Sequence, residues 1–398
     1  MSIKTSRTPL DPYILLSALF LVGLGVVIIY SGSGTYAESR GLSSTFFLFS
    51  HMKKVLLGVG ALLAGLFIPL RFWEKAGRPL LYICLMLLFY LLVSSRIQGA
   101  HGAKRWLEVG GLGIQPTELT KWALILFLAK ILVEKKEVIT QFGKGLVSSL
   151  VMACVVFLLI LFQPNYSSAS IILGTSLIMV FVGGARLMHL LALGLIGLPI
   201  LLVVMVSSTY RLKRVLAYFD PQEHGASSYQ TLQSLISLGN GGFLGSGLGS
   251  STQKLGYLPM PFTDTIFSIL GEELGFLGTT LCLTGFVILI LRSLNLSYKQ
   301  KHPFLQLVAV GIASSLGITF LMHIGVCTAV FPTTGQPLPF VSYGGSALIV
   351  SLLMVGVLLN MSANLDNRPE RSSDTGKHPV YSKAHVSQAL LRQRKYPT

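Results

Sequence analysis

The sequence predicts an all-α polytopic membrane protein with about ten transmembrane helices. Hydrophobic residues make up 52% of its 398 residues and charged residues only 12%, which is about half the charged share of soluble globular domains. The mean hydropathy is +0.68. A soluble protein of this composition would lack the polar side chains needed to cover its surface. Alternating strands of about ten residues, which a transmembrane barrel requires, are not visible in the sequence.

Ten segments are apolar and long enough to cross the hydrocarbon, which takes about 20 residues in a helix. In chain order these segments are 13–31, 54–70, 79–95, 118–134, 145–163, 168–184, 187–207, 265–291, 304–331 and 343–363. Two stretches, 145–183 and 303–365, contain no Asp, Glu, Lys or Arg. A polar turn with proline divides each of them into two spans, at 163–165 and at 332–339.

An even number of spans places both termini on one side of the membrane. Lys and Arg collect in cytoplasmic loops, and their distribution here predicts that residues 1–12 and the basic tail 364–398 are cytoplasmic. The polar, aromatic-poor tail is predicted to be disordered. The membrane domain then covers 13–363, with a long outer loop, 208–264, between the seventh and eighth spans. The net charge of +16 is explained by Lys and Arg in the inner loops or by the binding of an anionic lipid substrate. It does not indicate a nucleic-acid partner.

The outer loop carries a glycine-dense stretch at 239–249 between basic residues. Glycines allow positive φ and a close approach of backbone N–H groups to a ligand, and such groups can form a nest for phosphate. A flexible linker is the alternative interpretation. The flanking residues Arg211 and Lys254 favour anion binding.

Asp264 opens the eighth span and has two interpretations. A carboxylate is electrostatically favoured at a helix N-terminus, so Thr263 or Asp264 could cap the helix. The functional alternative is a general base at the boundary between water and lipid. From spacing alone, the cap is favoured. Glu272 and Glu273 lie deeper in the same span, where ionisable groups are expensive and usually functional.

The fourth span contains Glu118 and Lys121, three residues apart and therefore on one helix face. They form either an internal ion pair that holds the bundle together or a charged cavity facing the outer loops. His323 is expected to be a hydrogen-bonded packing residue. The cysteines lie in apolar runs without metal-ligand spacing, so they are expected to pack rather than to form disulfides or a zinc site; they are Cys84, Cys154, Cys282 and Cys327.

Seven motifs in order along residues 13–363 resemble those of the shape, elongation, division and sporulation (SEDS) family. They are Gly102-Ala-Lys-Arg-Trp106 with Gln115-Pro-Thr-Glu118 and Lys121; Gln163-Pro164; Arg211 through Pro221; Tyr229-Gln with Gln233-Ser234; Gly239 through Lys254 with Tyr257-Leu-Pro259; Thr263-Asp264 with Gly271-Glu-Glu-Leu-Gly275; and Pro332 through Pro339 leading to Ser342-Tyr-Gly-Gly-Ser346. Gln253-Lys254 and Gly271-Glu-Glu273 are closer to the FtsW branch of the family than to the RodA branch.

The resemblance implies a peptidoglycan glycosyltransferase that polymerises lipid II in the bacterial cytoplasmic membrane, during cell-wall synthesis at the septum. It implies that Asp264 is the general base and that a divalent cation, Mg or Mn, assists. A class B penicillin-binding transpeptidase, other divisome membrane proteins and membrane lipid are the implied partners. The implied substrate-binding residues are Arg105, Glu118, Lys121, Arg211, Lys254, Ser342, Tyr343 and Gly344.

The sequence departs from the family pattern at Asn165, Met260 and Phe262, where an acidic residue, a Glu and a His are usual. These changes remove polar groups beside Asp264 and leave open how a metal or a proton relay would be built there. Two other functions therefore stay in consideration. One is a lipid II flippase, which needs the same anion-binding groups but no base, and the other is a non-catalytic divisome scaffold.

Overall fold

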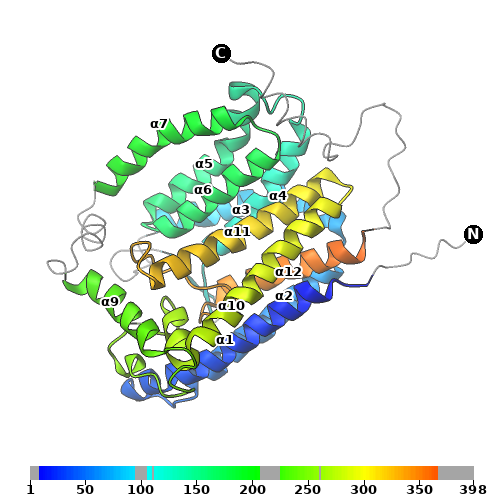
Figure 1. The fold of residues 1–398 in the computed structure, drawn as a ribbon. Coiled ribbons are helices and arrows are strands. Elements are labelled where there is room, and N and C mark those ends of the chain that lie inside the picture. Colours follow the sequence, from blue (N-terminus) through cyan, green and yellow to red (C-terminus); the bar gives the residue numbers. More distant parts are fainter. Residues whose placement is uncertain (1–8, 95–104, 110–111, 207–224, 260, 366–398) are drawn as a thin grey trace, which may run out of the picture.

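The structure, a computed structural model, describes residues 9–94, 105–109, 112–206, 225–259 and 261–365. Long helices lie side by side in one bundle, from α1 at one edge to α7 at the other (Figure 1). The α-helices are α1 (Pro12–Ser39), α2 (Phe46–Phe67), α3 (Leu70–Val93), α4 (Pro116–Glu134), α5 (Ser148–Phe162), α6 (Tyr166–Val182), α7 (Leu187–Val206), α9 (Gly225–Asn240), α10 (Ile266–Lys299), α11 (Pro303–Cys327) and α12 (Gly345–Ala363).

Each of the ten predicted segments overlaps one helix of this bundle. Among the described residues, seven helices are long and apolar enough to cross a membrane: α1, α2, α3, α5 with the π-helical turn Phe142–Val147 before it, α10, α11 and α12. Helix α6 is apolar but shorter, and α4 carries the charged pair Glu118 and Lys121 in its first turns. The chain is therefore an all-α, multi-pass membrane protein, while the count of ten spans stays a prediction.

The predicted starts of two helices were too late. Helix α2 begins at Phe46 rather than at residue 54, and α3 begins at Leu70 rather than at residue 79. The charged residues Lys53 and Arg71 end the apolar pattern, but they continue the helix with exposed side chains. Long basic side chains can lay their stems along apolar surface and keep the charge in water, so hydropathy alone does not locate these helix ends.

Two elements between the spans were not predicted. Strands β1 (Leu107–Val109) and β2 (Leu112–Ile114) form an antiparallel hairpin before α4. Helix α9 lies within the predicted outer loop, and it is fixed to α10 through serines: Ser237 Oγ donates to Ser268 O at 3.0 Å. The predictions for residues 1–8, for 208–224 and for the tail from 366 onward lie outside the described residues.

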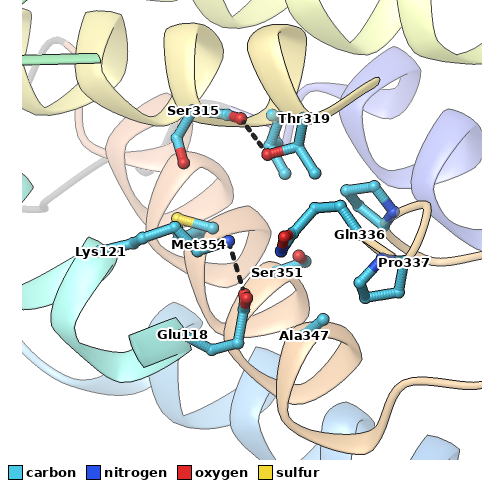
Figure 2. A pocket seen from close by; sticks show the side chains of 11 residues that line it. Glu118, Lys121, Ser315, Thr319, Gln336, Pro337, Ala347, Ser351 and Met354 are labelled. Carbon is cyan, nitrogen blue, oxygen red and sulfur yellow. Dashed lines mark hydrogen bonds and ion pairs between the residues drawn. The ribbon is translucent and has the colours of Figure 1, made fainter. Parts of the chain in front are cut away.

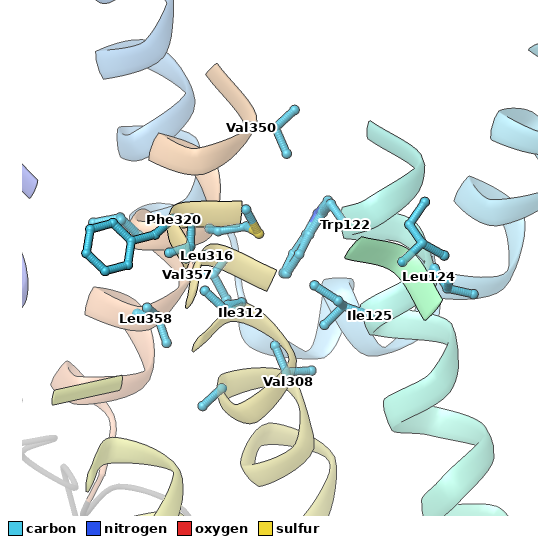
Figure 3. Packing of buried hydrophobic residues seen from close by; sticks show 14 of the residues in the cluster. Trp122, Leu124, Ile125, Val308, Ile312, Leu316, Phe320, Val350, Val357 and Leu358 are labelled. Carbon is cyan, nitrogen blue, oxygen red and sulfur yellow. The ribbon is translucent and has the colours of Figure 1, made fainter. Parts of the chain in front are cut away.

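The core lies between α4, α11 and α12, where apolar side chains such as Trp122, Ile312 and Val357 are fully or almost fully buried (Figure 3). A small polar pocket interrupts this core (Figure 2). Helices α2 and α12 approach each other closely at Gly65 and Gly356, where an added Cβ would collide with the main chain of the other helix. Small residues of this kind allow helix backbones to pack tightly in membranes.

Candidate functional site

Asp264 lies directly before α10 and is half-buried. Helix α10 begins at Ile266 with Thr265 as its N-cap, so the capping role favoured by spacing for Thr263 or Asp264 is wrong. The carboxylate faces the loop that follows α11. A Cβ built on Gly335 would lie 3.4 Å from Asp264 Oδ2, and Gly335 has a φ of 67°. A glycine at this position thus provides the positive φ and leaves room for the carboxylate.

Two of the predicted substrate-binding residues fix the backbone just before this carboxylate. The Ser342 hydroxyl donates to Thr263 O at 2.7 Å, and Tyr343 N donates to Phe262 O at 2.9 Å. Gly344 follows as the N-cap of α12. The segment that carries Asp264 is therefore anchored by main-chain contacts to the start of α12. Direct contact of Ser342, Tyr343 and Gly344 with substrate stays a prediction.

Phe262, one of the departures from the family pattern, is 3% exposed and belongs to an aromatic cluster. Its ring centroid lies 5.3 Å from that of Tyr36, 4.9 Å from that of Phe47 and 5.6 Å from that of Tyr343. Contacts of this kind contribute beyond the burial of area. The aromatic residue is thus explained by packing across α1, α2 and the start of α12. Met260, the second departure, lies outside the described residues.

Glu118 and Lys121 form the ion pair that their spacing predicts, with Oε2 and Nζ 2.8 Å apart and both side chains buried. They line a small pocket together with Ser315 and Thr319 of α11. Figure 2 shows the pair on α4 facing these hydroxyl-bearing residues and the Gln336 side chain. Glu118 Oε1 is buried without a hydrogen-bond partner. A buried oxygen in that state marks a place for water or a ligand group.

The loop after α11 connects this pocket with Asp264. Gln336 lines the pocket and directly follows Gly335, which borders the Asp264 carboxylate. Gln336 O is 2.8 Å from His323 Nδ1, so the prediction that His323 is a hydrogen-bonded packing residue is confirmed. The general-base candidate and the buried ion pair thus lie on two sides of one loop.

Arg105 is half-buried and contacts the turn between α5 and α6. Its Nε donates to Gln163 O at 3.2 Å, and its guanidinium also donates to Pro164 O. Asn165, the third departure from the family pattern, is the N-cap of α6, and its Oδ1 accepts from Ser168 N. An amide can provide this cap as a carboxylate would, so the helix start is retained.

Lys254, predicted to contact an anionic substrate, is buried in the structure. Its Nζ is 3.2 Å from Glu273 Oε1, and it donates to Ser31 O at 3.2 Å and to Gly249 O at 2.7 Å. An ammonium group has three protons, and all three have internal acceptors here. The structure gives Lys254 the role of an internal counterion for Glu273, and its contact with substrate stays a prediction.

The glycine-dense stretch seals a break in α10. Gly275 has a φ of 64° inside this helix, where the regular hydrogen bonds are interrupted. Gly242 O accepts from Phe276 N at 2.9 Å, and Gly247 N donates to Glu273 O at 3.0 Å. The positive φ values expected for these glycines are confirmed, for example at Gly242 and Gly247. Gly247 N donates to α10, whereas Gly242 N and Gly245 N donate to carbonyls of the loop itself and Gly249 N donates to Ser31 Oγ of α1. These N–H groups therefore have internal acceptors and do not form an open phosphate nest.

Glu272 is held by the same loop. Its carboxylate accepts from the hydroxyls of Ser251 and Thr252 at 2.5 and 2.9 Å, and from Thr252 N at 3.0 Å. Ser237 Oγ, which has one proton for both Glu272 and Ser268 O, is also 3.0 Å from this carboxylate. Such a number of donors stabilises a buried carboxylate. Glu272 and Glu273 therefore fasten the outer loop to α10 in this structure, and the sequence did not reveal this role.

Several site residues were missed by sequence reasoning. Ser315 and Thr319 recur four residues apart within an apolar span, a signal that could have placed them on one face. Gln336 lies in a turn that was recognised only as a break between spans. Arg211 lies outside the described residues. Within the described part of the chain, no three His, Cys, Asp or Glu side chains converge as a metal site.

Comparisons with known proteins agree along nearly the whole chain. The family model described as cell cycle protein, covering FtsW, RodA and SpoVE, matches residues 12–367. Stage V sporulation protein E of Bacillus subtilis is 40% identical, over 90% of this chain and 98% of that protein. The probable peptidoglycan glycosyltransferase FtsW of Geobacter sulfurreducens is 39% identical, over 90% of this chain and 96% of that protein.

Solved structures agree with the fold. A peptidoglycan synthase complex described as coordinating polymerization and crosslinking contains a chain that matches with a TM-score of 0.74 and 26% identity, over 90% of this chain and 99% of that one. RodA of Thermus thermophilus matches with a TM-score of 0.65 and 25% identity, over 90% and 98% of the two chains. The resemblance found in the sequence motifs is thus confirmed, and the chain belongs to the FtsW/RodA/SpoVE family of cell-cycle membrane proteins.

Proposed function

We propose that this protein is a peptidoglycan glycosyltransferase that polymerises lipid II into glycan strands, with Asp264 as the general base. Relatives of 39% and 36% identity carry the name peptidoglycan glycosyltransferase, and the matching chain of the synthase complex covers nearly the whole fold. The observation that carries the proposal is the position of Asp264. It is half-buried, it faces the loop at Gly335, and its backbone is anchored to the start of α12.

The reaction needs one base and an anionic leaving group. Asp264 takes the proton from the acceptor sugar hydroxyl, and that oxygen forms the new bond to the anomeric carbon of the donor. The bond from this carbon to the pyrophosphate oxygen breaks, and the lipid pyrophosphate leaves with the electron pair. A positioned general base contributes about 10²–10⁴-fold to such a step.

Basic residues and a divalent cation would stabilise the leaving pyrophosphate. Arg105 and Arg211 remain the predicted arginine contacts. No three His, Cys, Asp or Glu side chains converge among the described residues, so Asp264 would be the protein carboxylate for Mg or Mn, which in phosphoryl sites use one or two carboxylates plus substrate phosphates. Such a cation would be held by the pyrophosphate oxygens with Asp264 nearby, and it would neutralise negative charge on the leaving group.

The resemblance to one chain of a synthase complex supports a partnership with a transpeptidase of the class B penicillin-binding type. Polymerisation and crosslinking would then occur side by side in the bacterial inner membrane. With both termini cytoplasmic, Asp264 lies on the outer side, where lipid II is used. The FtsW names of the relatives favour a place at the division septum among other divisome membrane proteins.

The experiment is polymerisation of fluorescent lipid II in liposomes that contain the purified protein and its candidate transpeptidase. The expected result is a ladder of glycan chains for the unmodified protein and for Asp11→Asn, a control at the far end of α1. Asp264→Asn is expected to lower the rate by at least about 10²-fold, because it keeps the shape and removes the base. Retention of the full rate by Asp264→Asn would remove the assignment of the base.

The same liposomes separate the alternative functions. A flippase would move fluorescent lipid II between leaflets at equal rates with and without Asp264→Asn, and would make no glycan. If the protein is only a scaffold, a strain with Lys121→Met still divides, although this change removes the ion-pair partner of the buried Glu118 carboxylate. Glycan synthesis that requires Asp264, together with failed division of the Lys121→Met strain, supports the glycosyltransferase.

A further inference from the structure

Lys54 lies next to the aromatic cluster and has no acidic partner among the described residues. Its Nζ is 3.4 Å from the ring centroid of Tyr343, and its side chain is half-buried. None of the ion pairs between described residues includes it. A cation–π contact holds an ammonium group in place, but a ring does not neutralise its charge as a carboxylate would.

His51 lies three residues earlier on the same face of α2. It is fully buried, its ring centroid is 5.9 Å from that of Tyr343, and neither ring nitrogen has a hydrogen-bond partner. A neutral imidazole always carries one N–H donor. Leaving such a donor buried and unpaired costs about 1–3 kcal/mol. The structure thus combines an unneutralised cation and an unused donor at one place.

The two lysines that the sequence predicted to bind substrate form ion pairs elsewhere. Lys121 is paired with Glu118 at 2.8 Å, and Lys254 is paired with Glu273 at 3.2 Å. Lys54 is also tied to the general-base candidate, because Tyr343, whose ring it covers, donates its main-chain N–H to Phe262 O. The phenol of Tyr343 is fixed in turn, 2.8 Å from Ser50 Oγ.

We propose that Lys54 and His51 form a subsite for a phosphate-type oxyanion, and that the pyrophosphate of the lipid-linked substrate occupies it. This inference rests on the proposed function. The lysine provides the charge, the imidazole N–H provides a directed hydrogen bond, and the Tyr343 ring holds the lysine without neutralising it. The main-chain bond of Tyr343 then sets the distance between the bound phosphate and the segment that carries Asp264.

Binding of undecaprenyl pyrophosphate to the full-length protein in nanodiscs of zwitterionic lipid tests the subsite. This probe carries no sugar, so no glycosyl transfer occurs during the assay and the unmodified protein is the reference. Lys54→Met is expected to weaken binding by about 10- to 100-fold, the range for the loss of a charge-assisted hydrogen bond. Lys53→Met, at the exposed neighbouring position, is the matched control and is expected to bind normally. Lys54→Arg is expected to restore most of the affinity.

His51 and the source of the phosphate are tested in the same format. His51→Phe keeps an aromatic ring beside Tyr343 and is expected to weaken binding about tenfold. Adding phosphatidylglycerol to the nanodiscs is expected to leave the affinity nearly unchanged. Equal binding by Lys54→Met and Lys53→Met would overturn the subsite. If phosphatidylglycerol displaces undecaprenyl pyrophosphate, and Lys54→Met alone loses this displacement, the substrate assignment is overturned, because the subsite then binds bulk lipid.

The binding assay does not depend on catalysis. If Asp264→Asn still polymerises lipid II while Lys54→Met loses affinity, the general-base proposal fails and the subsite stands. If Asp264→Asn is inactive and Lys54→Met binds normally, the subsite fails and the glycosyltransferase proposal stands. The melting temperature of each variant is measured in detergent. A value equal to that of the unmodified protein shows that a change in affinity does not reflect misfolding.

Discussion

The buried ion pair between Lys254 and Glu273 leads to a prediction about the stability of the outer loop. The side chains are 6% and 0% exposed, and Nζ is 3.2 Å from Oε1. Lys254→Met removes the cation and leaves Glu273 with the hydroxyl of Ser31, at 2.6 Å, as its remaining partner at Oε1. Removing one member of a buried pair costs about 3–5 kcal/mol, because the other charge stays buried.

A double-mutant cycle isolates the pair from other effects of each substitution. We expect Lys254→Met and Glu273→Gln each to lower the free energy of unfolding, and the double variant to lose less than the sum. The coupling energy is expected to be about 2–3 kcal/mol, at the upper end for contacting residues. Arg78 and Glu134 provide the matched control, because their side chains are 43% and 42% exposed and exposed pairs contribute about 0.2–1 kcal/mol.

Unfolding free energies in lipid bicelles, measured by steric trapping, provide the assay. A coupling energy for Lys254 and Glu273 no larger than that for the exposed control pair would refute the reasoning. If Lys254→Met unfolds like the unmodified protein but binds lipid II more weakly, the lysine acts on the substrate, as the sequence first predicted.

Three further predictions concern packing and capping. Gly356→Ala places a Cβ well inside van der Waals contact with the main chain of α2, so little folded protein is expected by size-exclusion chromatography, whereas Gly60→Ala, with nothing within 4 Å, should yield normal amounts. Phe262→Ala is expected to destabilise by about 3–5 kcal/mol, and Phe46→Ala, at a side chain 47% exposed, by clearly less in the same unfolding assay. Asp11→Ala is expected to lower the melting temperature and Asp11→Asn to recover part of the loss, because the carboxylate caps α1 and an amide retains that cap.

The helices could be predicted from sequence because burial in lipid imposes a length and an apolar composition on each one. Their ends could not be predicted as well. Lys53 and Arg71 continue helices with exposed side chains, and a hydropathy pattern treats such residues as breaks. Helix α9 was missed because its polar side chains do not produce an apolar run, although Ser237 is buried against α10.

The candidate site was predictable where partners are neighbours in the chain. Glu118 and Lys121 are three residues apart, so the helix period alone places them together. Lys254 and Glu273 come from a loop and a helix, and the sequence does not show which cation neutralises which acid. For the same reason the sequence does not show that Lys54 lies beside Tyr343, because this contact depends on the packing of α2 against α12.

The break in α10 has a consequence for biogenesis. Backbone groups exposed by a broken helix are costly within lipid unless another segment satisfies them. The stretch that satisfies them here, 239–249, precedes α10 in the chain and so leaves the ribosome first. The seal is therefore already translated when the eighth predicted span enters the bilayer, and its insertion need not wait for any later helix. In a permuted gene that encodes the glycine stretch after α10, the stretch would not yet be translated when α10 enters the bilayer.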